Sequence, residues 1–279
     1  MKRIKSYEQS SLCYLVATPI GNLQDFSSRG KEVLSSVDII ACEDTRITAS
    51  LLSYYNIKKT LISYHEHNEQ NASQKLLELL KEGKKIAIVS DAGYPGISDP
   101  GEIMVKHCIE NNIPVSIIPG GNAFLPALIG SGLDNEHFYF HGFLPSKPSL
   151  RRKELEKLST YEMTIIFYES PHRIKETLND IYDIFKERKM CLVREITKIH
   201  EEYIYGTTSE LINLDETTLK GEMVLVIEGN KTKKEYSDEE LLSLINENIT
   251  TGLSKKEACK KVEELTNIKK NYLYQLTLK

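Results

Sequence analysis

Short apolar segments rich in β-branched residues alternate with longer amphipathic segments along this chain. Apolar runs of this length predict buried strands. The clearest runs are residues 12–17, 86–89, 115–118, 164–168 and 224–227. Leucine and isoleucine recur at helical spacing within residues 68–82 and 173–185, which predicts amphipathic helices. Strands that alternate with helices indicate α/β sheets.

The length of the chain indicates more than one such sheet. With 279 residues, 40% of them hydrophobic, the chain can form two domains and a small extra piece. We expect an N-terminal α/β domain in residues 12–120, a second α/β domain in residues 121–232 and a helical extension in residues 236–279. Residues 138–148 are interpreted as a strand that leaves one domain and a proline-marked turn that enters the next.

The helical extension is predicted from two capping boxes. In each box a serine is followed three residues later by a glutamate, a pattern that opens a helix. The two pairs are Ser237 with Glu240 and Ser254 with Glu257.

The sequence favours a cytoplasmic protein over a secreted or membrane protein. Basic residues near the start are followed by residues 7–11, where a signal peptide needs an apolar run of roughly seven or more residues. No segment approaches the roughly 18 apolar residues that span a bilayer. The five cysteines are scattered singly, which predicts reduced thiols without a zinc site.

Three loops rich in glycine and proline follow predicted strands, at residues 18–22, 90–96 and 119–123. Ligands of open α/β sheets bind at the carboxyl ends of strands, and glycine lets backbone N–H groups approach them. The loops therefore predict a small-molecule site, although each is alternatively a tight turn between strands. The chain lacks the phosphate-binding pattern G-x-x-x-x-G-K-[ST] and the dinucleotide-binding pattern G-x-G-x-x-G, which disfavours those ligands.

Polar residues cluster where predicted strands end, as they often do in clefts. Residues 43–46 (EDTR) follow one apolar run, and Asp91 follows another. Residues 169–173 (ESPHR) follow a third, although Ser170 and Pro171 are also typical of a helix start.

The segment HEHNE at residues 65–69 contains candidate metal ligands. His65 and His67 point to opposite sides if the segment is extended. Because no third strong ligand stands at suitable spacing, we expect no metal and favour polar contacts near a substrate.

The formal net charge of −4 provides no overall positive field, so an RNA partner has to bind local basic patches. One patch contains Lys147, Arg151, Arg152 and Lys153, and the other is the lysine-rich segment 255–270. Each patch is alternatively a solvated helix face.

Six motifs occur in order along the chain: VATPIGNL, EDTR, SDAGYPGISDPG, GFLPSK, YESPHR and REITKIHEE. Together they resemble the ribosomal RNA small subunit methyltransferase I group of the tetrapyrrole methylase superfamily, over about residues 12 to 230. The lysine-rich tail is similar to the helix-turn-helix-like extension of that group. Two positions differ from the group: Tyr94 replaces its usual threonine, and Gly121-Asn122 replaces its usual proline-serine or proline-cysteine pair.

The resemblance implies two α/β/α domains with a cleft between them, S-adenosylmethionine as methyl donor, and a homodimer. It implies methylation of a cytidine ribose 2′-oxygen in the decoding region of small-subunit ribosomal RNA, within the assembled subunit. By motif position, the residues expected near the cofactor are Thr18, Pro19, Asp91, Gly93, Asn122, Ala123, Tyr168, Ile227 and Gly229. The residues expected to bind RNA phosphates are Arg46, Lys147, Arg151, Arg152, Arg173 and Arg194.

Transfer of a methyl group to a hydroxyl requires alignment of the reacting atoms and a base or cation near the oxygen. The catalytic candidates are Glu43, Glu169, Glu195 and Lys198, although Glu195 and Lys198 are alternatively partners in a salt bridge. Two other functions stay open, because a shared fold does not determine the substrate. One is methylation of a tetrapyrrole or of a diphthamide precursor, and the other is a ribosome assembly factor without catalysis.

Overall fold

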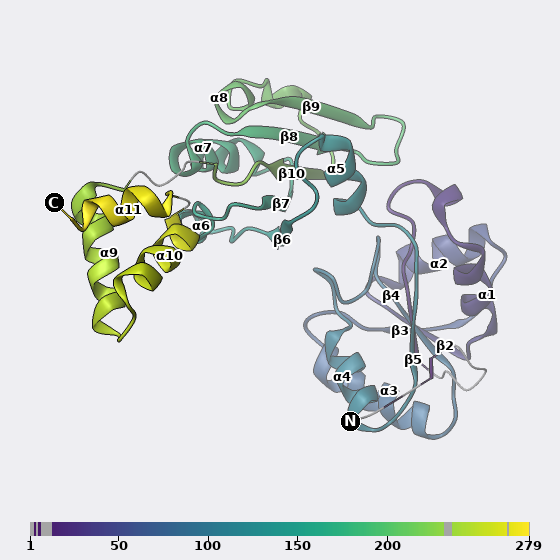
Figure 1. The fold of residues 1–279 in the computed structure, drawn as a ribbon. Helices are drawn as coiled ribbons and strands as arrows, with labels where there is room; N and C mark the ends of the chain where they lie inside the picture. The colour runs from purple at the N-terminus through teal and green to yellow at the C-terminus, as the bar shows by residue number, and fades with distance from the viewer. Residues whose placement is uncertain (1–2, 4, 7–12, 232–235, 267, 279) are drawn as a thin grey trace. The chain divides into compact units, whose positions relative to one another are not determined.

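The computed structural model describes residues 3, 5–6, 13–231, 236–266 and 268–278. Leu12, at which the first predicted strand and domain begin, lies outside these residues, as do residues 7–11 and 232. The chain divides into two compact units, residues 1–230 and 231–279, which are described separately below. Figure 1 shows the elements of both units.

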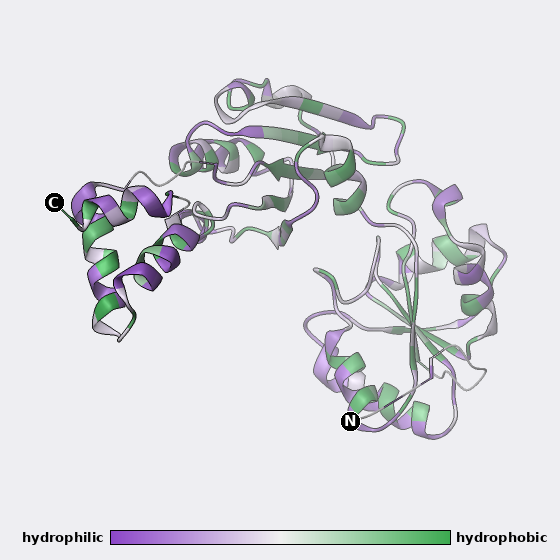
Figure 2. Ribbon diagram, in the orientation of Figure 1, coloured by the Kyte–Doolittle hydropathy of each residue, from purple (hydrophilic) through white to green (hydrophobic). Residues whose placement is uncertain are grey.

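The first sheet of the larger unit has five strands in the order β3-β2-β4-β1-β5, and all of its pairs are parallel. The strands are β1 (Cys13–Val16), β2 (Ile39–Cys42), β3 (Thr60–Ser63), β4 (Ile86–Val89) and β5 (Val115–Ile118). Their side chains are mostly hydrophobic (Figure 2), as parallel strands covered on both faces require. The predicted strands at 86–89 and 115–118 are confirmed.

Two helices cover each face of the first sheet. Leu34 of α1 and Leu52 of α2 pack with Ile40 on one face, and Leu76 of α3 and Met104 of α4 pack with Ile88 on the other. The helices are α1 (Ser28–Ser36), α2 (Thr45–Tyr54), α3 (Glu69–Lys81) and α4 (Glu102–Glu110), and the short 3-10 helix η1 (Leu23–Asp25) precedes α1. The helix predicted at 68–82 is confirmed as α3.

The second sheet is mixed, with the strand order β6-β7-β10-β8-β9. Only the β6·β7 pair is parallel; the pairs β7·β10, β10·β8 and β8·β9 are antiparallel. The strands are β6 (Phe138–Phe143), β7 (Thr164–Glu169), β8 (Lys189–Arg194), β9 (Glu202–Thr207) and β10 (Met223–Ile227). The strands predicted at 164–168 and 224–227 correspond to β7 and β10, which are neighbours, with β10 at the centre of this sheet.

Helices lie on both faces of the second sheet as well. Leu128 of α5 packs with Val193 on one face, whereas Leu155 of α6 and Leu178 of α7 pack with Phe167 on the other. The helices are α5 (Phe124–Ser131), α6 (Pro148–Leu158), α7 (Ile174–Phe185) and α8 (Thr208–Leu211), and the 3-10 helix η2 (Glu216–Thr218) precedes β10. The α/β architecture expected from the sequence, with helix-covered sheets, is confirmed.

The chain passes from the first sheet to the second between residues 118 and 124. The interpretation of residues 138–148 as the passage between domains is therefore wrong. β5 ends at Ile118 in the first sheet, and α5 already contacts strands β7, β8, β9 and β10 of the second. β6 pairs with β7, so the strand at 138–143 belongs to the second sheet. The apolar pattern of a strand does not reveal its partner, which explains why the passage was misplaced.

The smaller unit contains the helices α9 (Asp238–Thr250), α10 (Lys255–Thr266) and α11 (Lys270–Leu276). Their apolar faces enclose a core that includes Ile245, Val262 and Leu273. Both predicted capping boxes are present: the backbone N–H of each serine donates to the glutamate carboxylate, at 2.9 Å for Ser237 and 3.0 Å for Ser254. None of the helices that the structure describes is long and apolar enough to cross a membrane.

Candidate functional site

The three loops rich in glycine and proline meet at the carboxyl ends of β1, β4 and β5, which are adjacent strands. The backbone of Thr18 exchanges two hydrogen bonds with Gly93, at 2.9 and 3.2 Å, and the Thr18 hydroxyl donates to the Ser90 carbonyl at 3.1 Å. Gly120 packs so closely on Ala17 that an added Cβ would lie 2.8 Å from the Ala17 carbonyl oxygen. The loops therefore form one closely packed layer at this edge of the sheet.

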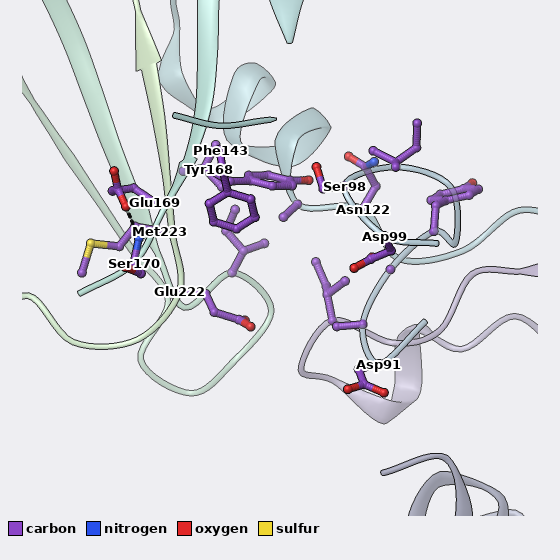
Figure 3. A pocket seen from close by; sticks show the side chains of 18 of the residues that line it. Asp91, Ser98, Asp99, Asn122, Phe143, Tyr168, Glu169, Ser170, Glu222 and Met223 are labelled. Atoms are coloured by element: carbon purple, nitrogen blue, oxygen red, sulfur yellow. Dashed lines mark hydrogen bonds between the residues drawn. The ribbon is translucent and has the colours of Figure 1, made fainter. Parts of the chain in front are cut away.

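Above this layer lies a cavity of about 390 Å³, within the roughly 300–1,000 Å³ that is usual for small-molecule sites. Asp99 and Glu222 project into it from opposite sides (Figure 3). The lining comes from loops after strands of the first sheet and from strand ends and adjoining loops of the second: Ile20, Glu43, Asp91, Ala92, Gly93, Tyr94, Ile97, Ser98, Asp99, Asn122, Ala123, Phe143, Tyr168, Glu169, Ser170, Pro171, Ile196, Glu222, Met223 and Val224.

The charged residues of this lining are all acidic: Glu43, Asp91, Asp99, Glu169 and Glu222. No lysine, arginine or histidine occurs among the lining residues that the structure describes. Carboxylates in a partly desolvated cavity attract a cation and repel phosphate. The cavity therefore suits a ligand that carries positive charge and has an apolar part.

Asp99 is the lining residue whose titration is most strongly perturbed. Burial, followed by repulsion from Glu43 and Asp91, raises its pKa to about 7, although a hydrogen bond with Ser90 opposes the shift. The sequence interpretation did not single out Asp99, which stands in the motif SDAGYPGISDPG. A carboxylate inside a glycine- and proline-rich loop after a strand was the available signal.

Glu43 and Asp91 follow β2 and β4, which are neighbouring strands of the first sheet. Burial raises the pKa of each, and repulsion from Asp91 adds to the shift of Glu43. Asp91 accepts a hydrogen bond from the backbone N–H of Asp44 at 3.1 Å. Asp44 caps α2 and pairs with Arg46, and hydrogen bonds from Arg46 lower its pKa to about 2.

Glu169 has a fully buried side chain that is surrounded by donors. Its carboxylate accepts hydrogen bonds from the Ser170 backbone at 2.7 Å, from Arg173 at 2.8 and 3.0 Å, and from the Thr177 hydroxyl at 2.7 Å. These contacts connect the end of β7 to the start of α7. The carboxylate therefore positions the loop at the cavity wall, and its oxygens are already occupied by donors of the protein.

Glu195 and Lys198 form the salt bridge that was one of the two interpretations of this pair, at 2.9 Å. Lys198 also donates to Glu222 at 3.1 Å. The hydrogen bond from Lys198 lowers the pKa of Glu195; burial alone would lower the pKa of Lys198, but its bonds to Glu195 and Glu222 raise it. Neither residue lines the cavity; Lys198 reaches its rim through Glu222.

Five of the nine residues expected near the cofactor line the cavity: Asp91, Gly93, Asn122, Ala123 and Tyr168. The other four do not, namely Thr18, Pro19, Ile227 and Gly229. Thr18 is buried within the loop layer, and Ile227 is buried in β10. Gly229 packs against the backbone of Glu162, where an added Cβ would lie 2.0 Å from the carbonyl oxygen.

The two departures from the family pattern both form contacts within the loop layer. The Tyr94 hydroxyl oxygen accepts a hydrogen bond from the Gly120 N–H at 3.2 Å, which links the second loop to the third. The Asn122 side chain accepts from the Leu125 N–H at 2.9 Å and helps to start α5.

The six residues expected to bind RNA phosphates differ in accessibility. Lys147 and Arg46 are exposed, although Arg46 pairs with Asp44. Arg152 is partly exposed and pairs with Asp180 and Asp183. Arg173 pairs with Glu169, and Arg194 pairs with Glu202.

Arg151 stands apart because its side chain is only 2% exposed. It donates to Asp180 at 2.7 Å and to Glu176 at 3.2 Å, so its charge is neutralised inside the protein. In this structure Arg151 joins α6 to α7 and does not present its guanidinium to a phosphate.

His65 and His67 do not point to opposite sides, because the segment forms a turn before α3 and is not extended. Their ring centroids lie 5.9 Å apart. Within the described part of the chain, no group of three or more histidine, cysteine or acidic side chains is arranged to hold a metal ion.

Comparisons with known proteins agree with this architecture. The family of Tetrapyrrole (Corrin/Porphyrin) Methylases matches residues 12–212. The chain resembles two solved structures in fold: the methyltransferase CobJ (TM-score 0.59, 16% identity, 82% of this chain and 98% of that chain covered) and uroporphyrin-III-C-methyltransferase from Thermus thermophilus (TM-score 0.54, 19% identity, 77% and 93% covered).

Other known proteins are far more similar to the chain in sequence than these two solved structures are. The chain is 44% identical over 285 residues to ribosomal RNA small subunit methyltransferase I of Halalkalibacterium halodurans, with 99% of each chain covered. It is 44% identical over 270 residues to the protein of the same name from Bacillus subtilis, with 94% of this chain and 92% of that one covered. The resemblance predicted from the six motifs is thereby confirmed, and the chain belongs to the tetrapyrrole methylase family and, within it, to the ribosomal RNA small subunit methyltransferase I group.

Proposed function

We propose that this chain transfers a methyl group from S-adenosylmethionine to the ribose 2′-hydroxyl of a cytidine in the decoding region of small-subunit ribosomal RNA. The observation that carries the proposal is the cavity above the loop layer, whose charged lining residues are all acidic and suit a positively charged ligand. It occurs in a chain whose relatives, matched over nearly their full length, are named as methyltransferases of small-subunit ribosomal RNA. We further propose that the protein works in the cytoplasm on the assembled subunit.

The residues of the cavity fit S-adenosylmethionine. The sulfonium and the ammonium group of this molecule are positive, and the charged side chains of the described lining are negative. Ile20, Ile97 and Tyr168 supply apolar surface for an adenine ring. Asp91, Gly93, Asn122 and Ala123 are the residues that we propose to hold the cofactor from the loop layer.

When bound, S-adenosylmethionine supplies an electrophilic methyl carbon. The contribution of the chain is alignment, since the hydroxyl oxygen, the methyl carbon and the sulfur must lie in line. Phe143, Ile196 and Val224 line the cavity beside the acidic residues and exclude water from it. The hydroxyl must also lose its proton, so a carboxylate has to lie within reach of the oxygen.

We propose that RNA phosphates contact the exposed cations on both units. Lys147 and Arg46 are accessible on the larger unit, and Lys255, Lys256 and Lys260 are exposed on α10 of the smaller one. Residues 12–120 and 121–232 would then act as the two catalytic domains, and residues 236–279 as an RNA-docking domain. Phosphate contacts position a nucleic acid without reading its sequence.

We also propose a homodimer. Ile129 and Leu125 of α5 are 69% and 43% exposed, and Tyr205 of β9 is 62% exposed near the same helix, where its hydroxyl donates to the Gly130 carbonyl at 2.8 Å. Exposed apolar surface of this kind favours association. Sedimentation of a monomer at micromolar concentration would contradict the dimer.

The decisive experiment incubates the protein with S-adenosylmethionine labelled on the methyl group and with unmodified small ribosomal subunits. Nuclease digestion and mass spectrometry then locate the label. We expect it on one cytidine ribose 2′-oxygen, and label on a base would contradict the proposed position.

Two other functions make different predictions when the same assay also offers a tetrapyrrole or a protein substrate. Label on a tetrapyrrole or on a protein, with none on RNA, would favour the substrates of the solved relatives in fold. Binding of S-adenosylmethionine without transfer to any substrate would favour a ribosome assembly factor. The charge of the cavity alone does not separate these functions, whereas the position of the label does.

A further inference from the structure

We propose that the Phe143 ring is a stacking platform for the base of the nucleotide that is methylated. This inference rests on the proposed function and adds to it a substrate-binding residue. Phe143 belongs to the motif GFLPSK, in which Lys147 was the only residue expected to take part in binding.

The backbone of β6 changes direction just before Phe143. The pairing of β6 with β7 shifts register between Phe140 and Gly142, as in a β-bulge, and Gly142 has a φ of +81°. A bulge with a left-handed glycine bends a strand and redirects the side chains beside it. An added Cβ at Gly142 would lie 3.2 Å from the Ser98 hydroxyl oxygen, so the bulge packs against the second loop. Phe143, the next residue, lines the cavity together with Ser98.

A row of aromatic rings supports Phe143 in this position. Its ring centroid lies 5.6 Å from that of Tyr168, with an angle of 62° between the rings. Tyr168 contacts Phe140 at 4.9 Å, and Phe140 stacks on Phe124 of α5 at 4.4 Å. Contacts of this kind restrict the orientation of a ring. Phe143 is the exposed end of the row, beside Tyr168 in Figure 3, and 54% of the residue is accessible.

The charge of the cavity determines which part of a nucleotide approaches Phe143. The charged residues of the described lining are all acidic, so they repel phosphate, whereas ribose and base are neutral. Lys147 is exposed at the start of α6, four residues after Phe143, where it can hold a phosphate outside the cavity. A nucleotide therefore enters with its ribose and base and leaves its phosphates at the surface.

An aromatic ring suits a base that enters in this way. A nucleotide that leaves its stack loses the contacts with its neighbours, and stacking on an aromatic side chain replaces them. Every base has a π face, so Phe143 would orient the nucleotide without reading its identity. The ribose attached to that base is thereby held at the cavity in which we propose that S-adenosylmethionine binds.

The first test measures methyl transfer to unmodified small ribosomal subunits at saturating S-adenosylmethionine. Phe143→Leu keeps an apolar side chain but removes the ring, and it should lower kcat/KM for the subunits by about 5- to 150-fold. Phe143→Trp keeps an aromatic face and should have an activity close to that of the wild type. Phe138→Leu is the matched control and should also behave as wild type, because Phe138 is 39% exposed on the same strand but does not belong to the described lining.

Two further measurements on the same variants separate stacking on RNA from packing within the protein. Calorimetry with S-adenosylhomocysteine should give Phe143→Leu the affinity of the wild type, and urea denaturation should give Phe143→Leu and Phe138→Leu similar midpoints. A loss of cofactor affinity as large as the loss in kcat/KM would place Phe143 in the cofactor pocket and overturn the proposal. A wild-type kcat/KM in Phe143→Leu, or an equal loss in Phe143→Trp, would overturn it as well.

The second test observes stacking independently of methyl transfer. The chain contains no tryptophan, so Phe143→Trp introduces a single fluorescent probe at this position. With S-adenosylhomocysteine bound, a short oligoribonucleotide of cytidines should quench its emission, whereas an abasic oligoribonucleotide of the same length and charge should not. Equal quenching by both, or by neither, would overturn the proposal. Quenching by the cytidines alone, in a protein that methylates no small-subunit RNA, would contradict the proposed function and support the platform.

Discussion

The Arg151 guanidinium donates to the Asp180 carboxylate over 2.7 Å, at a site where 2% of the arginine side chain and 11% of the aspartate side chain are exposed. Removing one partner of a buried ion pair leaves the other charge uncompensated, at a typical cost of about 3–5 kcal/mol. Arg151→Ala should therefore lower the free energy of unfolding by about this amount, as measured by urea denaturation.

Arg152→Ala is the matched control, because Arg152 is 42% exposed and pairs with the same Asp180. Exposed pairs contribute about 0–1 kcal/mol. If Arg151→Ala were instead fully stable and bound small subunits weakly, Arg151 would be an RNA contact after all.

The repulsion between Glu43 and Asp99 predicts that the titration of Asp99 can be displaced by one substitution. Glu43 raises the pKa of Asp99, so Glu43→Gln should lower it and keep the carboxylate ionised in more acidic solution. The midpoint of the Asp99 titration, followed by NMR of carbon-13-labelled carboxyl groups, should move down by roughly half to one pH unit. An unmoved midpoint would show that the two carboxylates do not act on each other.

The raised pKa of Asp99 also predicts how stability depends on pH in the absence of cofactor. From about pH 4 to 7 the folded protein retains a proton on Asp99 that the unfolded chain has released, so the free energy of unfolding falls as the pH rises. Because Asp99 is partly exposed, we expect this contribution to be about 0.5–2 kcal/mol after allowance for solvent screening. Asp99→Asn should flatten the decline in thermal or urea unfolding between these pH values, and an equal decline in both proteins would contradict the prediction.

The hydrogen bond from Gly120 to Tyr94 predicts a specific effect of removing one hydroxyl. Tyr94→Phe leaves the Gly120 N–H without its acceptor and should lower stability by about 0.5–1.5 kcal/mol. Because the second and third loops are linked by this bond, affinity for S-adenosylmethionine should fall several-fold in calorimetry. Tyr54→Phe, at a side chain that is 63% exposed, should change neither quantity.

The helical unit at the end of the chain predicts a separation of two binding activities. Deletion of residues 236–279 removes the exposed lysines of α10 and should weaken binding to small subunits about tenfold or more, with a smaller dependence on salt. Affinity for S-adenosylmethionine should stay within about twofold, since the described lining of the cavity comes from residues 20–224. Equal losses of both affinities would contradict a separate docking role.

Several features of this protein were determined by local sequence pattern. Helical spacing of Leu76, Leu77 and Leu80 predicted α3 and the face that it buries, and the two serine–glutamate pairs predicted the starts of α9 and α10. The order of six motifs identified the family, which the relatives confirm. These features could be predicted because each depends on residues that are neighbours along the chain.

Only the tertiary structure decided which groups are buried together. The sequence does not distinguish the parallel pairs of the first sheet from the mostly antiparallel pairs of the second, since strand pairing joins residues that are far apart in the chain. Arg151 and Lys147 belong to the same basic patch of the sequence, yet Arg151 is buried against Asp180 and Lys147 is exposed. Asp99 acquires its raised pKa mainly from burial and then from repulsion by Glu43, which follows β2, and by Asp91 of its own loop. Burial and charge repulsion depend on distance in space, and the fold alone sets that distance.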